Sequence, residues 1–163
     1  MNPFGWLRDK CRELLQLKDT SHSIALGTAI GMFFGFVPLW GFKTLLALGI
    51  SRLLRANLLA AAIAASLHDV ALPALPLLLR WEYDIGYWIL SDPHELPARL
   101  SLSHQSASVW LHWSTFLTIG RPLLLGAFVF SVPVAAVTYY VTLVLVERTR
   151  TKEKAANEQP PRA

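Results

Sequence analysis

The stretch SIALGTAIGMFFGFVPLWGF, residues 23–42, decides how this chain folds, because it is apolar, uncharged and has small residues at a strict spacing of four. Residues four apart lie on one face of a helix, so another backbone can approach closely along that face. Glycine costs a helix in water roughly 1 kcal/mol per residue relative to Ala, and close packing in lipid or protein offsets this cost. This helix-packing face consists of Ser23, Gly27, Gly31 and Gly35.

Residues 38–41, Pro-Leu-Trp-Gly, are predicted to end this first helix, because proline cannot continue helical hydrogen bonding. A second apolar segment follows and ends at a basic turn with Arg52 and Arg55. Each arm is about 20 Å long at roughly 1.5 Å per residue, whereas the apolar core of a bilayer is ~30 Å thick. Residues 24–54 are therefore predicted to form a re-entrant hairpin that enters and leaves on one side. The alternative is that residues 23–42 cross the membrane completely.

The composition favours a membrane protein, since 16% of the 163 residues are charged and soluble domains carry about 25%. Residues 122–146 contain no charged side chain, and this run is longer than the about 20 apolar residues that a membrane-spanning helix needs. The basic residues that give the net charge of +4 flank the apolar segments. This pattern indicates contact with anionic membrane lipids rather than with nucleic acid.

The sequence thus predicts an all-α, polytopic membrane protein with a re-entrant helical hairpin and two transmembrane helices. Lys and Arg gather at the N-terminus, at the hairpin turn and in the C-terminal tail, so both termini are predicted to be cytoplasmic, in a bacterial inner membrane. The predicted order is a basic helix on the bilayer surface (1–20), a membrane domain (21–146) and a polar basic tail (147–163). The membrane domain is predicted to contain, in order, the hairpin (24–54), a span (58–79), an external segment rich in aromatic residues (80–115) and a second span (116–146).

Two crossings give a monomer little interior in which polar groups can be buried. A homo-oligomer or a membrane-protein partner is therefore expected, and the glycine-rich face of residues 23–35 is one candidate contact surface. The same face could equally pack inside the chain, against residues 58–67.

Four strings resemble the bacterial family named domain of unknown function 2062: IALGTAIG (24–31), FGFVPLWG (34–41), KTLLAL (43–48) and LLRAN (53–57). The likeness extends over about residues 21–88. It implies a membrane protein whose family has no agreed activity. In that family an Asn-Pro pair usually follows where this chain has His68-Asp69, so the resemblance assigns these two residues no role.

Lys43 is the first candidate for chemistry, because in a re-entrant hairpin it lies near the tip, deep in the bilayer, where a charge is costly. It also begins the second arm, and a helix N-terminus offers free backbone N–H groups to an anion. Thr44 adds a hydroxyl, and Trp40 and Gly41 form the turn beside it. A lipid phosphate is the ligand that this arrangement favours. The alternative is a lysine that extends to the far interface.

His68 and Asp69 are the second candidate, because they interrupt the apolar segment 58–79. Neighbouring helical residues point about 100° apart, so the two serve one ligand only where the helix is broken. Pro73 makes such a break plausible. The alternative is a polar pair that faces the protein interior, with Asp69 protonated or bonded to Lys43 or His22.

The sequence contains no catalytic set, no metal-ligand spacing and no cofactor motif, and its single Cys11 cannot form an internal disulfide. A non-enzymatic role is therefore expected. The leading hypothesis is that the chain binds or translocates a lipid phosphate or a similar amphipathic anion at the hairpin tip. The alternative is an accessory subunit that packs against a partner and anchors a complex in the membrane.

Overall fold

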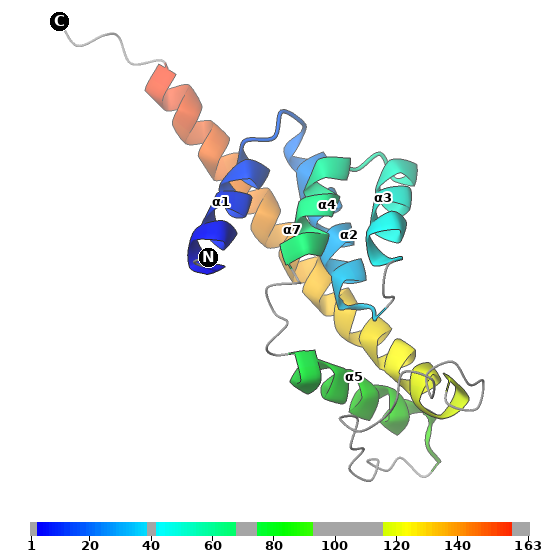
Figure 1. Cartoon of the computed structure of the whole chain (residues 1–163). Coiled ribbons are helices and arrows are strands. Elements are labelled where there is room, and N and C mark those ends of the chain that lie inside the picture. The colour runs from blue at the N-terminus through cyan, green and yellow to red at the C-terminus, as the bar shows by residue number, and fades with distance from the viewer. Residues whose placement is uncertain (1–2, 39–41, 68–74, 93–115, 158–163) are drawn as a thin grey trace, which may run out of the picture.

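The computed structural model of the chain describes residues 3–38, 42–67, 75–92 and 116–157 (Figure 1). Regular structure in this part of the chain is helical, which confirms the predicted all-α class. The helices are α1 (Pro3–Leu15), α2 (Ser21–Phe36), α3 (Lys43–Leu53), α4 (Leu58–Leu67), α5 (Leu75–Leu90), the short π-helix η4 (Phe116–Gly120) and α7 (Arg121–Asn157).

Helix α2 lies at the centre of the fold and contacts α3, α4 and α7. It begins after Thr20, whose side chain accepts a hydrogen bond from the backbone N–H of Ser23 at 3.1 Å. This bond satisfies a backbone donor that the helix leaves unpaired. Ile24 and Ala25 are fully buried. A helix that is apolar on every side fits this enclosed position.

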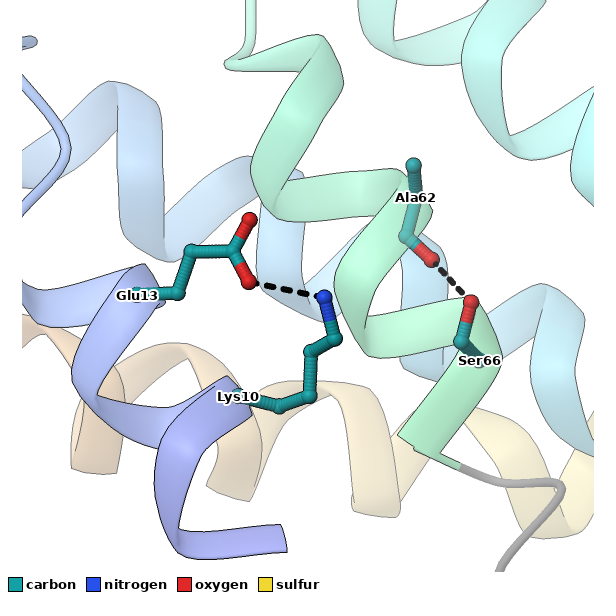
Figure 2. A network of polar contacts seen from close by, with 4 residues as sticks. All are labelled: Lys10, Glu13, Ala62 and Ser66. Atoms are coloured by element: carbon teal, nitrogen blue, oxygen red, sulfur yellow. Dashed lines mark hydrogen bonds and ion pairs between the residues drawn. The ribbon is translucent and has the colours of Figure 1, made fainter. Parts of the chain in front are cut away.

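Helix α1 packs on the bundle through Leu14, which is buried against Ile24, Ala60 and Val146. The Lys10 ammonium of α1 pairs with the Glu13 carboxylate one turn later at 2.7 Å. Figure 2 shows this pair beside α4, where the Ser66 hydroxyl donates to the carbonyl of Ala62 at 2.9 Å. The helix predicted to lie on the bilayer surface thus packs on the bundle through Leu14, while Arg8, Asp9 and Arg12 are exposed.

Helix α7 is the one helix of the described residues that is long and apolar enough to cross a membrane, with a candidate span at Leu117–Lys152. It runs diagonally past the other helices (Figure 1). Most of its apolar surface is exposed, including Val132, Val137 and Tyr140. Such an apolar exterior suits lipid or another apolar partner.

Two elements differ from the boundaries expected from the sequence. The predicted span 58–79 contains α4, which ends at Leu67, and the start of α5, which continues to Leu90 through the first residues of the predicted external segment. Helix α7 continues past Val146 to Asn157, into the predicted polar tail. This extension has a tertiary reason, because Arg150 donates to two carbonyls of the linker between α1 and α2 and to the Ser21 hydroxyl at the start of α2.

Candidate functional site

The glycine-rich face of α2 lies against α4 of the same chain. A methyl group on Gly27 would overlap the carbonyl oxygen of Asn57, and one on Gly31 would overlap that of Ala61. Gly35 is buried at the end of the same helix. Ser23, the first residue of the face, accepts a hydrogen bond on its carbonyl from the Asn57 N–H at 3.0 Å. The small residues thus allow two helix backbones to touch.

Lys43 is the first residue of α3 and is half-buried, and Thr44 next to it is exposed. The preceding residue, Phe42, has helical backbone angles, and within the described residues no side chain caps this helix start. The first N–H groups of a helix have no partner inside the helix, and this property is what lets a helix N-terminus bind an anion. The other four residues proposed for this site, Trp40, Gly41, His68 and Asp69, lie outside the described residues.

An apolar groove of about 380 Å³ runs along α2, between α3 and α7. It is open on one side, and its lining comes from residues far apart in the sequence. Phe33 and Phe34 of α2 line it two to three residues before the helix ends at the hairpin turn. The lining residues are Leu26, Ala29, Ile30, Phe33 and Phe34 of α2, Ile50 of α3, and Ala135, Ala136 and Tyr139 of α7.

Tyr139 links this groove to the N-terminal end of α2. Its hydroxyl lies 2.7 Å from Nδ1 of His22, and the two rings meet edge to face with centroids 5.7 Å apart. The pair joins α2 to α7, and it places two polar groups where the apolar lining begins. His22 thereby has a partner other than the predicted Asp69.

A polar cluster, formed by Asp19, Ser23, Asn57 and Arg150, lies at the same end of the bundle. The Asp19 carboxylate accepts hydrogen bonds from the Ser23 hydroxyl at 2.8 Å and from the Asn57 amide at 3.0 Å. These two donors, with the backbone N–H of Thr20, lower the pKa of Asp19 below its usual value. Arg150 donates to the carbonyls of Leu17 and Asp19. The cluster therefore connects the α1–α2 linker with α2, α4 and α7.

A tight turn between α3 and α4 brings Asn57 into this cluster. Arg55 has a positive φ of 55°, a left-handed conformation that costs a non-glycine residue roughly 1 kcal/mol. The N–H of Ala56 donates to the carbonyl of Ser51 at 2.8 Å and closes the turn. The Asn57 side-chain oxygen then accepts from the N–H of Ala60 at 2.8 Å, so Asn57 caps α4 while its amide donates to Asp19.

The groove and the polar cluster could not be predicted from the sequence, because both combine residues of α7 with residues from distant parts of the chain. A helical pattern shows which residues share a face, and it does not show which other helix that face meets. Asn57 was the one available signal, because an Asn before an apolar run is a common capping residue. Among the described residues, no three His, Cys, Asp or Glu side chains gather in a group that could hold a metal ion.

The family model described as "uncharacterized protein conserved in bacteria (DUF2062)" matches residues 5–155, which is nearly the whole chain. The protein belongs to this family, as the resemblance of residues 21–88 predicted. No curated protein and no solved structure matches the chain. The class that fold and family define is thus a bacterial protein whose described residues are helical and include one helix long and apolar enough to span a membrane.

Proposed function

We propose that this protein is an integral membrane protein that binds an amphipathic anion, with an acyl chain in the α2–α3–α7 groove and a phosphate at the start of α3. The observation that carries the proposal is the apolar groove, whose lining reaches the end of α2 next to the hairpin turn. Each buried methylene group contributes about 0.8 kcal/mol, so an acyl chain is a favourable occupant of such a groove.

The phosphate position rests on Lys43 and on the N-terminus of α3. The ammonium supplies a point charge, and the backbone N–H groups at the helix start supply directional donors. Thr44 adds a hydroxyl on the same turn. The arrangement combines a cation, a helix N-terminus and an apolar channel, which are the three parts that an anionic lipid needs.

The topology proposed for this function is the one expected from the sequence. Helix α2 has 16 residues and α3 has 11, and at about 1.5 Å per residue neither reaches across a ~30 Å core, which supports a re-entrant hairpin. Helix α7 is proposed as one of two crossings, and residues 58–79 as the other. The basic flanks support cytoplasmic termini in a bacterial inner membrane.

Groove filling tests the acyl-chain half of the proposal. Ala136→Trp places a large side chain in the groove, whereas Val141→Trp adds the same bulk to an exposed position of α7 outside it. Native mass spectrometry of the full chain, purified in mild detergent with added phosphatidylglycerol, measures bound lipid. We expect retention to fall about tenfold in the groove variant alone, since a displaced chain loses several methylene contacts. Equal retention by wild type and Ala136→Trp would contradict the proposal.

Charge removal tests the phosphate half. Lys43→Ala and Lys43→Glu should lower the preference for phosphatidylglycerol over phosphatidylcholine by about tenfold, because hydrogen bonds to charged groups contribute roughly 1.5–3 kcal/mol. Arg52→Ala, an exposed cation in the last turn of the same helix, is the matched control. If both Lys43 variants bind and move lipid in liposomes as wild type does, the phosphate does not bind at α3.

A second candidate is an accessory subunit that packs against a partner and anchors a complex in the membrane. The observation that favours it is the exposed apolar side of α7. On this side Val132, Val137 and Val141 each expose about half of their surface or more. Lipid alone can cover this surface, and so can a partner helix. Purification of the full chain from its membrane, with cross-linking before extraction, distinguishes the accessory role from lipid binding in the groove. A stoichiometric second protein favours the accessory role, and a lipid-binding species without one favours the groove.

A further inference from the structure

Glu82 is a carboxyl group enclosed where α5 meets α7. Only 2% of the surface of Glu82 is exposed. Within the described part of the chain its Oε2 atom has no hydrogen-bond partner. Helix α5 crosses α7 near its N-terminal end, remote from the C-terminal tail (Figure 1). The same crossing holds an apolar cluster of Tyr83, Ile119 and Leu123. A titratable side chain is thus buried among apolar neighbours against the first turns of α7; Glu82 itself belongs to neither predicted span (58–79 and 116–146), and it lies outside the groove.

Two glycines hold the helices in contact at this point. A methyl group on Gly86 would overlap the carbonyl oxygen of Pro122, and one on Gly126 would overlap the carbonyl oxygen of Glu82 itself. Because the backbones touch at Glu82 and again one turn later at Gly86, the Glu82 carboxyl gains water only when α5 moves away from α7. The Glu82 carboxyl is therefore buried only in the closed form, in which α5 is packed against α7.

The charged groups around the crossing do not neutralise Glu82. On α5, Arg80 pairs with Asp84 at 3.6 Å on a more exposed side, and the nearby titratable groups are the phenols of Tyr83 and Tyr87. On α7 the first residue, Arg121, is exposed, and η4 carries no ionisable side chain. Among the described residues none of these groups hydrogen-bonds to Glu82.

A buried carboxylate without a cation or donor is strongly unfavourable, so the closed crossing requires the neutral acid. Burial accordingly raises the pKa of Glu82 from 4.5 to about 7. When packing raises the pKa of a carboxyl group, the packed state is favoured most below the pKa of the unpacked group. This advantage is lost as the pH rises to the pKa of the packed group. The closed crossing is therefore most stable below pH 4.5, weakens as the pH rises towards 7, and stays weakened above that value.

We propose that Glu82 is a proton-binding site that couples the α5–α7 crossing to pH. In the closed form the neutral carboxyl is packed against α7. When it releases its proton to water, the carboxylate is hydrated and α5 separates from the first turns of α7. The ratio of open to closed forms rises about tenfold per pH unit between the two pKa values.

Distance measurements between spin labels on the full chain test this coupling. With Cys11 replaced by Ser, labels at Ile89 of α5 and Val129 of α7 occupy exposed positions on the two helices. At about pH 5.5 we expect one short distance, and at about pH 8.5 a second, longer population, as the linkage requires. Glu82→Gln should keep the short distance at both pH values, because its amide is always neutral. Asp84→Asn, on the same helix, should keep the wild-type pH dependence.

Two results would overturn the proposal: a wild-type distance that does not change with pH, or a pH-dependent distance that persists in Glu82→Gln. Infrared spectroscopy decides the matter if Glu82→Gln does not fold. The C=O band of a protonated carboxyl in the wild-type chain should then titrate near pH 7, well above the range of exposed carboxyls. If all such bands vanish by about pH 5.5, Glu82 is not a proton site.

Discussion

The side-chain amide of Asn57 donates a hydrogen bond to the Asp19 carboxylate at 3.0 Å, across 38 positions of sequence. The backbone N–H of Asn57 donates at the same time to the carbonyl of Ser23. One residue thus starts α4, holds α2 beside it and orders the linker that follows α1. The close contact of α2 with α4 depends on this register, because Asn57 lies directly opposite Gly27.

Asn57→Ala should lower the free energy of unfolding by about 1–3 kcal/mol, since it removes a helix cap and leaves the Asp19 carboxylate with one donor fewer. Thermal unfolding in detergent, followed by circular dichroism, measures the change. Asn57→Asp restores the cap but places a second carboxylate beside Asp19, so it should be less stable than wild type. A melting temperature of Asn57→Ala equal to that of wild type would show that the bond contributes nothing.

Asp19 should make the fold sensitive to acid. The hydrogen bonds from Ser23 and Asn57 lower its pKa below 3.8. A carboxylate with a lowered pKa stabilises the fold at pH values above the unfolded-state pKa, and this contribution is lost as the pH falls through the folded-state pKa. Asp19→Asn should therefore be less stable than wild type at neutral pH, and the difference should shrink below pH 3.8. Asp9→Asn, at an exposed position of α1, is the control; a pH-independent difference would contradict this account.

The glycines of α2 should tolerate no methyl group, whereas a glycine of α3 should benefit from one. Gly27→Ala and Gly31→Ala force apart backbones that touch, at a cost of about 1–3 kcal/mol each for overpacking. At Gly49, in the described part of the chain, no atom lies within 4 Å of the added methyl. Gly49→Ala should therefore stabilise the helix by about 0.5–1 kcal/mol. The free energy of unfolding, measured for the three variants and wild type under the same conditions, should fall for Gly27→Ala and Gly31→Ala and rise for Gly49→Ala. Equal effects at all three positions would refute the packing argument.

Cysteine accessibility should resolve the topology. With Cys11 replaced, single cysteines at Trp40, Lys43, His68 and Ser91 are labelled in intact cells by an impermeant maleimide. If residues 24–54 form a re-entrant hairpin, Ser91 labels from outside, and the hairpin positions stay protected until the membrane is permeabilised. If positions 40 and 43 label as readily as position 91, residues 23–42 cross the membrane and the accessory role gains weight.

The sequence by itself determined the local structure of this protein. A proline and a glycine at 38 and 41 separate α2 from α3, Thr20 provides a cap, and the uncharged run 122–146 lies within one long helix. These features follow from helix propensities and from side chains within a few residues of one another, so the local sequence is enough to predict them.

Only the tertiary structure decided what each helix face meets. The glycine-rich face of α2 meets α4, Tyr139 reaches His22, and Glu82 is enclosed at Gly126. Each of these relations joins residues 30 to 117 positions apart, and the helical period specifies a face without specifying its partner. The packing of whole helices, which minimises empty space and unpaired polar groups across the bundle, makes that choice.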